Sequence, residues 1–354
     1  MYLKSENLKV LLIGPFGYSG GVSIHMDRLV KLLKNDISFF IIEDTPISVS
    51  KDLSFNIRIP SNFLRILKEI NNNDIIHIHS GNWILRIFFV LLGTLFRKKI
   101  ILTIHSFRLN FLQKIFTYLA MFSCHKIIVV NHNIKNELPK FLEKKLFVKE
   151  AFIPPFLDKK KSLDKKFKDL IKINRNKKNI LLCANAFRIT LIEGKDLYGI
   201  DQTISLAKYA KENKLPIFII YIIANIISES EQELLKKYLK IINKDSLENY
   251  INIINDDISF VNLIKECDIV LRPTLSDGDS LTVREGIWFN KLVIASDVSK
   301  RPEKTILYKT GDSLDLFKKV KKSVKLKSNT NKSFYSMYDN LSTDYLNIYK
   351  QCYN

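Results

Sequence analysis

The densest group of side chains that could do chemistry lies in one stretch of the last third of the chain. An apolar run ends at Pro273, and the polar loop that follows carries Asp277 and Asp279 on either side of a glycine. Because aspartate and serine cap helix N-termini well, a helix is expected to begin near Ser280. The N–H groups at such a helix start attract phosphate. Glu285, about one turn inside the helix, could accept hydrogen bonds from vicinal hydroxyls, so the stretch predicts a site for a ligand with phosphate and hydroxyl groups.

A second candidate is the glycine-rich loop near the start of the sequence, which runs from Gly14 to Val22 and contains Gly17, Gly20 and Gly21. It follows the first expected strand and opens the first expected helix, so its backbone could approach an anion closely. The spacing is neither the dinucleotide-binding pattern nor a Walker A loop, since no lysine followed by serine or threonine comes after the glycines. An ordinary turn between a strand and a helix is the alternative interpretation.

Histidines at the ends of two expected strands form the third candidate. His77 and His79 share one face of their strand. His105 ends the next strand, so it should lie at the same edge of the sheet as these two. A metal site is conceivable, but the pattern brings no carboxylate or cysteine to support it, and we expect no metal. A structural role is the alternative for each, and only His105 is taken as a functional candidate. The remaining histidines are interpreted as incidental: His25, His125 and His132.

Composition and charge limit the class of protein. A chain of 354 residues, 46% hydrophobic and 26% charged, is globular and long enough for two domains. The net charge of +20 could attract nucleic acid, an anionic membrane or anionic substrates, or could reflect a composition biased towards lysine. Nucleic acid is not expected, because the sequence has neither zinc-finger spacing nor an aromatic RNA-binding strand motif. The start lacks a signal-peptide pattern and the four cysteines are scattered, so a cytoplasmic protein with reduced thiols is expected.

The order of the expected elements predicts an α/β protein. Short β-branched runs alternate with amphipathic stretches, which is the pattern of parallel sheets covered by helices. In the first half the expected strands are 10–13, 39–43, 75–79, 100–105, 126–130 and 147–153, and the expected helices are 22–33, 62–70, 83–96 and 111–124. In the second half the expected strands are 180–184, 217–223, 251–254, 269–271, 292–295 and 305–308.

A double proline, Pro154-Pro155, followed by a lysine-rich run predicts a linker between two domains. The sequence therefore predicts Rossmann-like domains over residues 1–157 and 170–330. A last helix within 331–354, expected at about 333–349, could pack back on the first domain. Since ligands of open α/β sheets bind beyond the carboxyl ends of the strands, one ligand between two facing domains is expected.

The stretch around Asp277 resembles the donor-binding signature of family-4 retaining glycosyltransferases of the GT-B fold, in which seven residues separate two acidic ones. In this sequence the pair is Asp277 and Glu285. The first acid is usually glutamate, so Asp277 is a departure that shortens the reach to the sugar. The residues from Arg272 to Glu285 more closely resemble a branch of this family that is found in bacterial surface-polysaccharide gene clusters. The resemblance implies that Glu285 binds the donor ribose and that Asp277 contacts the transferred sugar. It also implies that the diphosphate binds to the backbone of Ser280, Leu281 and Thr282.

Two segments of the first half agree with this resemblance. The residues Gly20, Gly21 and Val22 match the family's first glycine loop, which lies against the donor phosphates. His105 stands where the family often has an active-site histidine, so the resemblance implies that it orients the donor sugar.

In the second half, Arg188 follows the first expected strand, where the family usually has a basic residue on the diphosphate. Lys195 is the nearest match to a partner lysine, at a looser spacing. The resemblance covers residues 10–312 and implies α/β architecture with two facing Rossmann-like domains, a nucleotide-sugar donor as substrate, no cofactor and no metal. The run 277–279 could instead be the Asp-x-Asp metal motif of another glycosyltransferase fold, but its position before the helix that carries Glu285 argues against that.

An apolar, uncharged run at Ile87–Phe96 precedes the basic residues 97–99. It is too short to cross a bilayer, which takes about 20 residues. It is either a buried crossover helix or, with Phe111–Phe122 and the positive net charge, a patch that binds the inner face of an anionic plasma membrane. The second interpretation fits a lipid-linked saccharide acceptor in surface-polysaccharide synthesis.

Three functions are therefore open. A retaining, metal-independent glycosyltransferase is the main expectation. A sugar-nucleotide epimerase of the same fold would need acid and base carboxylates in the cleft. A non-enzymatic basic binding protein would bind nucleic acid with a steep dependence on salt.

Overall fold

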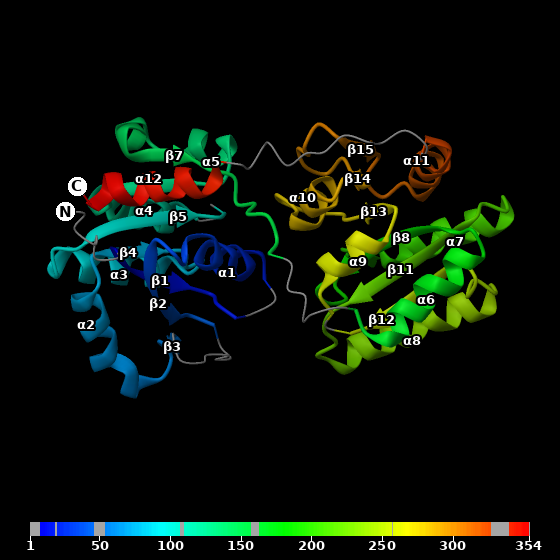
Figure 1. Cartoon of the computed structure of the whole chain (residues 1–354), viewed down its shortest axis with the longest axis horizontal. Helices are drawn as coiled ribbons and strands as arrows, with labels where there is room; N and C mark the ends of the chain where they lie inside the picture. Colours follow the sequence, from blue (N-terminus) through cyan, green and yellow to red (C-terminus); the bar gives the residue numbers. More distant parts are fainter. Residues whose placement is uncertain are drawn as a thin grey trace. The chain divides into compact units, whose positions relative to one another are not determined.

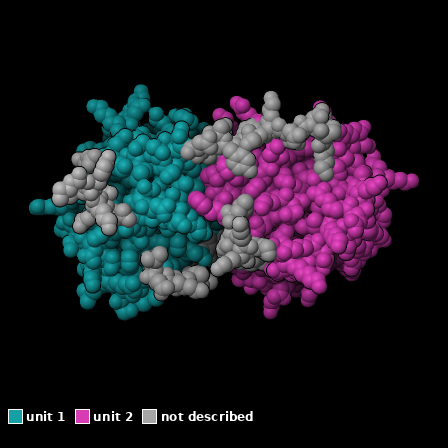
Figure 2. Space-filling model, viewed as in Figure 1, with its two compact units in different colours: residues 1–153, 338–354 teal, residues 154–337 magenta. Residues whose placement is uncertain are grey.

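The computed structural model describes residues 8–17, 20–45, 54–106, 110–156, 163–256, 258–326 and 340–353. The chain divides into two compact units, which have different colours in Figure 2. Unit 1 consists of Met1–Ile153 and Tyr338–Asn354, and unit 2 of Pro154–Met337. The boundary falls at the double proline, four residues before the expected end of the first domain at 157, a residue that lies outside the described ranges.

Unit 1 is built on a parallel sheet with the strand order β3-β2-β1-β4-β5-β6-β7. Its strands are β1 (Leu8–Gly14), β2 (Ile37–Glu43), β3 (Ser54–Asn56), β4 (Ile75–Ile78), β5 (Lys99–Ile104), β6 (Lys126–Val129) and β7 (Leu146–Val148). The central strands β1, β4 and β5 are buried on both faces, which is why their sequences are apolar at almost every position.

Helices cover both faces of this sheet, and each face carries its own apolar core. One face is covered by α1 (Gly21–Leu33) and α12 (Leu341–Tyr353). The other is covered by α2 (Phe63–Asn72), α3 (Trp83–Leu95), α4 (Phe111–Ser123), α5 (His132–Glu137) and η2 (Lys140–Lys145), and the short η1 (Pro60–Asn62) leads into α2. Although α12 follows all of unit 2 in the sequence, it packs against α1, β4 and β5 (Figure 1).

Unit 2 contains a second parallel sheet, with the order β12-β11-β8-β13-β14-β15. Its strands are β8 (Ile180–Ala186), β11 (Ile217–Ile223), β12 (Ile251–Asn255), β13 (Ile269–Arg272), β14 (Leu292–Ser296) and β15 (Thr305–Tyr308). A small antiparallel hairpin joins β9 (Leu191–Ile192) to β10 (Lys195–Asp196). The helices are α6 (Lys165–Asn176), α7 (Ile200–Glu212), α8 (Glu229–Lys244), α9 (Phe260–Glu266), α10 (Leu281–Trp288) and α11 (Ser313–Leu326). The apolar side chains again form one core on each face of the sheet.

The prediction of an α/β protein with two Rossmann-like parallel sheets is confirmed. Several details differ. The short edge strand β3 was not expected, and β7 ends at Val148 because the polar Lys149 and Glu150 interrupt the apolar run. The last helix spans Leu341–Tyr353 and so continues past the expected end at 349, while the expected start at 333 lies outside the described part of the chain. Among the described helices, none has the length and apolar character needed to cross a bilayer.

Candidate functional site

The loop expected to bind a donor lies after β13 and leads into α10. Ser280 is the N-cap of α10, and its Oγ accepts a hydrogen bond from the backbone N–H of Val283 (3.5 Å). The Oγ1 of Thr282 donates to Oδ1 of Asn185 (3.0 Å), which ties the helix start to the end of β8. Since β8 and β13 are neighbours in the sheet, the first turn of α10 lies at the carboxyl edge of two adjacent strands. This is the usual ligand position in open α/β sheets.

The other expected donor residues of α10 lie in its first two turns. Leu281 is the first helical residue and is half-buried, whereas Glu285 is buried and only 5% exposed. Arg284 points its Nε at Oδ1 of Asp279 (2.6 Å), on the loop just before the helix. The loop and the first turns of the helix therefore form one connected structure.

Asp277 is the centre of a buried ion network. Its Oδ2 accepts from Nε of Arg272 (2.9 Å) and from Nη1 of Arg301 (2.9 Å), and its Oδ1 accepts from Nη2 of Arg272 (3.2 Å). The hydroxyl of Thr274 and the backbone N–H of Gly278 are also within hydrogen-bond distance. Desolvation works to raise the pKa of the Asp277 carboxyl, but the two arginines outweigh it and lower the pKa below its ordinary value of 3.8. Asp277 is therefore ionised and holds two cations from separate parts of the chain.

The end of β13 is packed tightly against the start of α7. The carbonyl oxygen of Pro273 accepts from Nε2 of Gln202 (3.0 Å), and Tyr308 donates to Oε1 of the same glutamine (2.8 Å). Gly199 has φ of +73°, and a Cβ on it would lie 2.0 Å from the Pro273 oxygen. Only glycine fits this close approach, which fixes the position at which the donor loop begins.

Arg188, the expected diphosphate ligand, follows β8. Its Nε donates to Oε1 of Glu231 at 2.5 Å, and its side chain is 44% exposed. Glu231 belongs to a capping box at the start of α8, where its other oxygen accepts from the N–H groups of Ile227 and Ser228. Desolvation opposes ionisation of Glu231, but these hydrogen bonds and Arg188 lower its pKa. Arg188 is thus held at the rim by a buried, ionised carboxylate, while Lys195 is exposed on β10.

The first glycine loop lies in unit 1. Gly20 is the N-cap of α1 with an extended backbone, Gly21 is the first helical residue, and Val22 is half-buried. Residues 18 and 19 of this loop lie outside the described ranges. The structure therefore bears out the expected helix start, and the phosphate contact of these residues stays a prediction.

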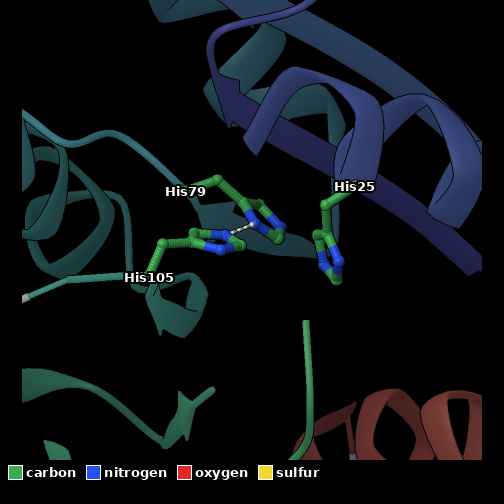
Figure 3. Close-up of side chains that lie close together, drawn as sticks. All are labelled: His25, His79 and His105. Atoms are coloured by element: carbon green, nitrogen blue, oxygen red, sulfur yellow. Dashed lines mark hydrogen bonds between the residues drawn. The ribbon is translucent and has the colours of Figure 1, made fainter. Parts of the chain in front are cut away.

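Three histidines meet at the carboxyl edge of the unit 1 sheet (Figure 3). His79 follows β4, His105 follows β5, and His25 comes from the second turn of α1. The Nδ1 of His79 and the Nε2 of His105 lie 3.1 Å apart and share a hydrogen bond. The ring of His25 is centred 5.4 Å from that of His79 and 5.0 Å from that of His105.

Two neighbouring features position these histidines. His77 lies beneath the cluster, with Nδ1 2.6 Å from the hydroxyl of Tyr349 on α12 and Nε2 2.7 Å from the hydroxyl of Thr103. At the end of β1, Gly14 lets His79 approach, because a Cβ there would lie 3.0 Å from the Cβ of His79. The final helix and the first strand therefore both support the cluster.

Burial governs the charge of the cluster. Desolvation lowers the pKa of His25 to about 4 and the pKa values of His79 and His105 well below the ordinary 6.5. Arg28 adds to the effect on His25, and Arg86 adds to it on His105. All three imidazoles are therefore neutral at pH 7.

The structure brings together some of the expected site residues and adds others. Asp277 and the start of α10 lie together in unit 2, and His105 lies with His79 in unit 1. The interpretation of His25 as incidental is wrong, because the residue belongs to the histidine cluster. Nothing in the local spacing links His25 on α1 to the histidines that follow β4 and β5. Arg301 and Glu231 were missed because no spacing rule links them to Asp277 or Arg188.

No family model matches this sequence, and no curated protein is similar to it in sequence. Solved structures are similar in fold. The Anabaena Alr3699/HepE protein in complex with UDP aligns with a TM-score of 0.68 at 13% identity, over 97% of this chain and 98% of that chain. A glycosyltransferase from Rickettsia africae ESF-5 aligns with a TM-score of 0.70 at 17% identity, over 98% and 99%. Sucrose-phosphate synthase from Thermosynechococcus elongatus gives 0.61 at 12% identity, over 97% and 98%. The chain therefore has the two-unit α/β fold of these proteins, the GT-B fold, over nearly its whole length.

Proposed function

We propose that this chain is a glycosyltransferase that takes a sugar from a nucleotide-diphosphate donor. The observation that carries the proposal is the start of α10, which lies at the carboxyl edge of β13 and is tied to the end of β8 through Thr282 and Asn185. The fold supports the same proposal, because the similar HepE protein was crystallised with UDP, with UDP and glucose, and with UDP-glucose. A UDP-sugar is therefore our first choice of donor.

In this proposal the diphosphate binds to the backbone N–H groups at the start of α10. The helix dipole favours negative charge there, and it needs no cation to do so. Glu285 accepts hydrogen bonds from the ribose hydroxyls, and Arg188 turns its exposed guanidinium to the diphosphate while Glu231 holds it at the rim. The residues proposed to bind the diphosphate through their backbone are Ser280, Leu281 and Thr282.

We propose that Asp277 contacts the donor sugar while it stays paired with its two arginines. The lone pairs of its carboxylate already accept from Arg272, Arg301, Gly278 and Thr274, so a sugar hydroxyl would replace the hydroxyl of Thr274, the longest of these contacts at 3.4 Å. The roles expected for His105, Lys195 and the loop from Gly20 to Val22 stay predictions.

Departure of the nucleotide diphosphate places negative charge on the leaving phosphate. Groups that are already oriented towards that charge lower the barrier most, and Arg188 and the first turn of α10 are such groups. We propose that transfer proceeds with retention of anomeric configuration and that the departing phosphate takes the proton of the acceptor hydroxyl.

A nucleotide-sugar screen tests the donor site. The full chain is heated in the presence of UDP- and GDP-sugars, because a donor that binds only the folded state raises the melting temperature. Glu285→Gln should lose the donor-dependent increase, measured against the melting temperature of the same variant without ligand. An unchanged increase in that variant contradicts the assigned site.

Turnover tests the role of Arg188. Loss of one oriented donor should lower kcat by about 10²–10³-fold in Arg188→Gln. Arg175→Gln is the matched control, because Arg175 is also a partly exposed arginine in an ion pair of unit 2. Conversion of the donor without any acceptor would identify an epimerase. Nucleic-acid binding with a steep salt dependence, and no donor binding, would identify a basic binding protein.

We propose further that unit 1 binds an anionic membrane surface, at the inner face of the plasma membrane, and takes a lipid-linked saccharide acceptor. The helices α3 and α4 pack against each other, and both expose apolar side chains, here together called the apolar face. The apolar face consists of Ile84, Leu91, Leu95, Phe111, Leu112, Ile115, Phe116, Leu119 and Phe122. Basic side chains stand beside it, with Lys145 over the ring of Phe122 and Lys114 on α4 itself. Apolar side chains that insert and lysines that meet anionic lipid headgroups are the pattern of a surface-bound helix pair.

Co-sedimentation with vesicles tests the apolar face. Leu95→Glu combined with Leu119→Glu removes two exposed side chains, each contributing up to about 2 kcal/mol if buried in lipid, so binding to anionic vesicles should fall at least tenfold. Ile227→Glu is the matched control, because Ile227 in unit 2 is 64% exposed, as is Leu119. Equal loss in the control, or no binding of the unchanged protein at low salt, contradicts the membrane proposal.

A further inference from the structure

The three histidines of unit 1 are close enough to share one ion. Taking one ring nitrogen from each of His25, His79 and His105, all three nitrogens lie within 4.8 Å of one another. Two ligands of a tetrahedral ion with bonds of about 2.0–2.1 Å are separated by roughly 3.3 Å. Nδ1 of His79 and Nε2 of His105 are already 3.1 Å apart, which is close to that separation. The distances within the set of three nitrogens need to shorten by at most roughly 1.5 Å.

The orientation of His25 is fixed by the backbone. Its Nδ1 lies 2.7 Å from the carbonyl oxygen of Ala151. Since a carbonyl can only accept, Nδ1 carries the hydrogen and Nε2 carries the lone pair of the neutral ring. Metal-binding histidines are usually held in this way, with the second ring nitrogen donating to a carbonyl or carboxylate.

Two ring nitrogens of the cluster are buried without a partner. Within the described part of the chain, Nε2 of His25 and Nε2 of His79 have no hydrogen-bond partner, and both side chains are at least 98% buried. A buried polar atom without a partner costs about 1–3 kcal/mol, and buried polar groups in folded proteins are normally satisfied. A metal ion on Nε2 of His25, which carries the lone pair, would remove that cost at His25.

We propose that His25, His79 and His105 bind one divalent transition-metal ion, with Zn²⁺ as the reference. Neutral imidazole is a good ligand for Zn²⁺, Cu²⁺ and Ni²⁺, and a poor one for Mg²⁺ and Ca²⁺. Three protein ligands leave a fourth position for water or an anion. Arg28 and Arg86 bring positive charge close to the cluster, which favours an anion in that position. The site lies in unit 1 and does not depend on the proposed donor site, and it gives His105 a role other than a direct contact with sugar.

Metal titration of the full chain, purified without a polyhistidine tag and treated with chelator, tests this proposal. Zn²⁺ should bind with a stoichiometry of one in competition with a chromogenic chelator, and Co²⁺ should give the visible absorption of a four-coordinate site. His25→Gln and His79→Gln should each weaken Zn²⁺ binding at least about 100-fold, since even loss of a group that only orients a ligand costs 10–100-fold. His132→Gln is the control, because His132 is an exposed histidine of α5 and should leave binding unchanged.

The wild-type protein decides the question even if the variants fail to fold. X-ray absorption of the zinc-loaded chain should show three imidazole ligands with Zn–N distances of about 2.0–2.1 Å. Absence of one-to-one binding, a site with fewer than three imidazoles, or equal weakening in His132→Gln would each overturn the proposal.

Discussion

Replacing Asp277 by asparagine tests how the donor loop is held. The carboxylate of Asp277 neutralises Arg272 and Arg301, whose side chains are 13% and 2% exposed. An asparagine at this position would keep the shape of the side chain but lose the charge. It would also present an NH₂ group, a hydrogen-bond donor, to guanidinium groups that are themselves donors.

The expected loss of stability in Asp277→Asn follows from the burial of the ion network. Removing one partner of a buried ion pair typically costs about 3–5 kcal/mol, because the remaining charge stays buried without compensation. Here one substitution leaves two arginines in that state, so we expect Asp277→Asn to lower the free energy of unfolding of unit 2 by at least about 3 kcal/mol. The matched control is Asp279→Asn on the same loop. Its pair with Arg284 is more exposed at the carboxylate, 22% against 11% for Asp277, and should contribute no more than about 1 kcal/mol.

The two tryptophans make the measurement specific to a unit. Trp83 lies on α3 in unit 1 and Trp288 on α10 in unit 2. In a Trp83→Phe background, urea unfolding followed by the fluorescence of Trp288 reports on the helix that the loop precedes. A change in midpoint at constant m-value then measures the change in stability.

The pH dependence provides an internal check. Because the pKa of Asp277 is lowered in the folded state, its stabilising contribution is complete above 3.8 and is lost as pH falls through the folded-state value. The difference between wild type and Asp277→Asn should therefore be full at pH 7 and shrink below about pH 4. The assigned role of Asp277 is refuted if Asp277→Asn destabilises unit 2 no more than Asp279→Asn does at pH 7.

Three further predictions concern stability. Gly199→Ala should lower the free energy of unfolding, measured with urea, by more than about 2 kcal/mol, because its Cβ would collide with the carbonyl oxygen of Pro273. Gly194→Ala, also at positive φ but in open space, should lower it by only about 1 kcal/mol. Tyr349→Phe should destabilise unit 1 by about 1–3 kcal/mol, since it removes a partner of a buried histidine, while Tyr353→Phe, at an exposed site, should have little effect. Desolvation raises the pKa of Asp196 from 3.8 to about 6, so its ionisation destabilises the folded state as pH rises. At pH 8, Asp196→Asn should therefore raise the free energy of unfolding by up to about 3 kcal/mol, from the pKa difference 6 − 3.8, and it should raise the melting temperature accordingly. At pH 4 it should have little effect on either quantity.

The strands were predictable because both faces of each sheet are covered. A strand such as β11, buried at every position, has to be apolar throughout, and its expected range 217–223 agrees with the structure. The edge strand β3 could not be found in this way, since a three-residue segment containing serine and asparagine carries no apolar pattern.

The candidate sites were predictable only where they are local in sequence. Ser280 and the helix after it form a single segment, so capping rules locate the start of α10. The ion network of Asp277 depends on Arg301, and the histidine cluster on His25, and each of these contacts joins elements that only the folded sheet brings together. Local spacing carries no information about such pairs.

The helix α12 has a consequence for how the protein is made. Its Tyr345 and Tyr349 fill the core of unit 1, yet every residue of unit 2 precedes them in the sequence. As the chain leaves the ribosome, unit 2 is complete and free to fold while one sheet face of unit 1 is covered by α1 alone and still lacks α12. The order of maturation is therefore reversed, with the N-terminal unit reaching its native state last. Until then, the apolar side chains that α12 covers in the native state are exposed, and such surfaces favour aggregation of folding intermediates.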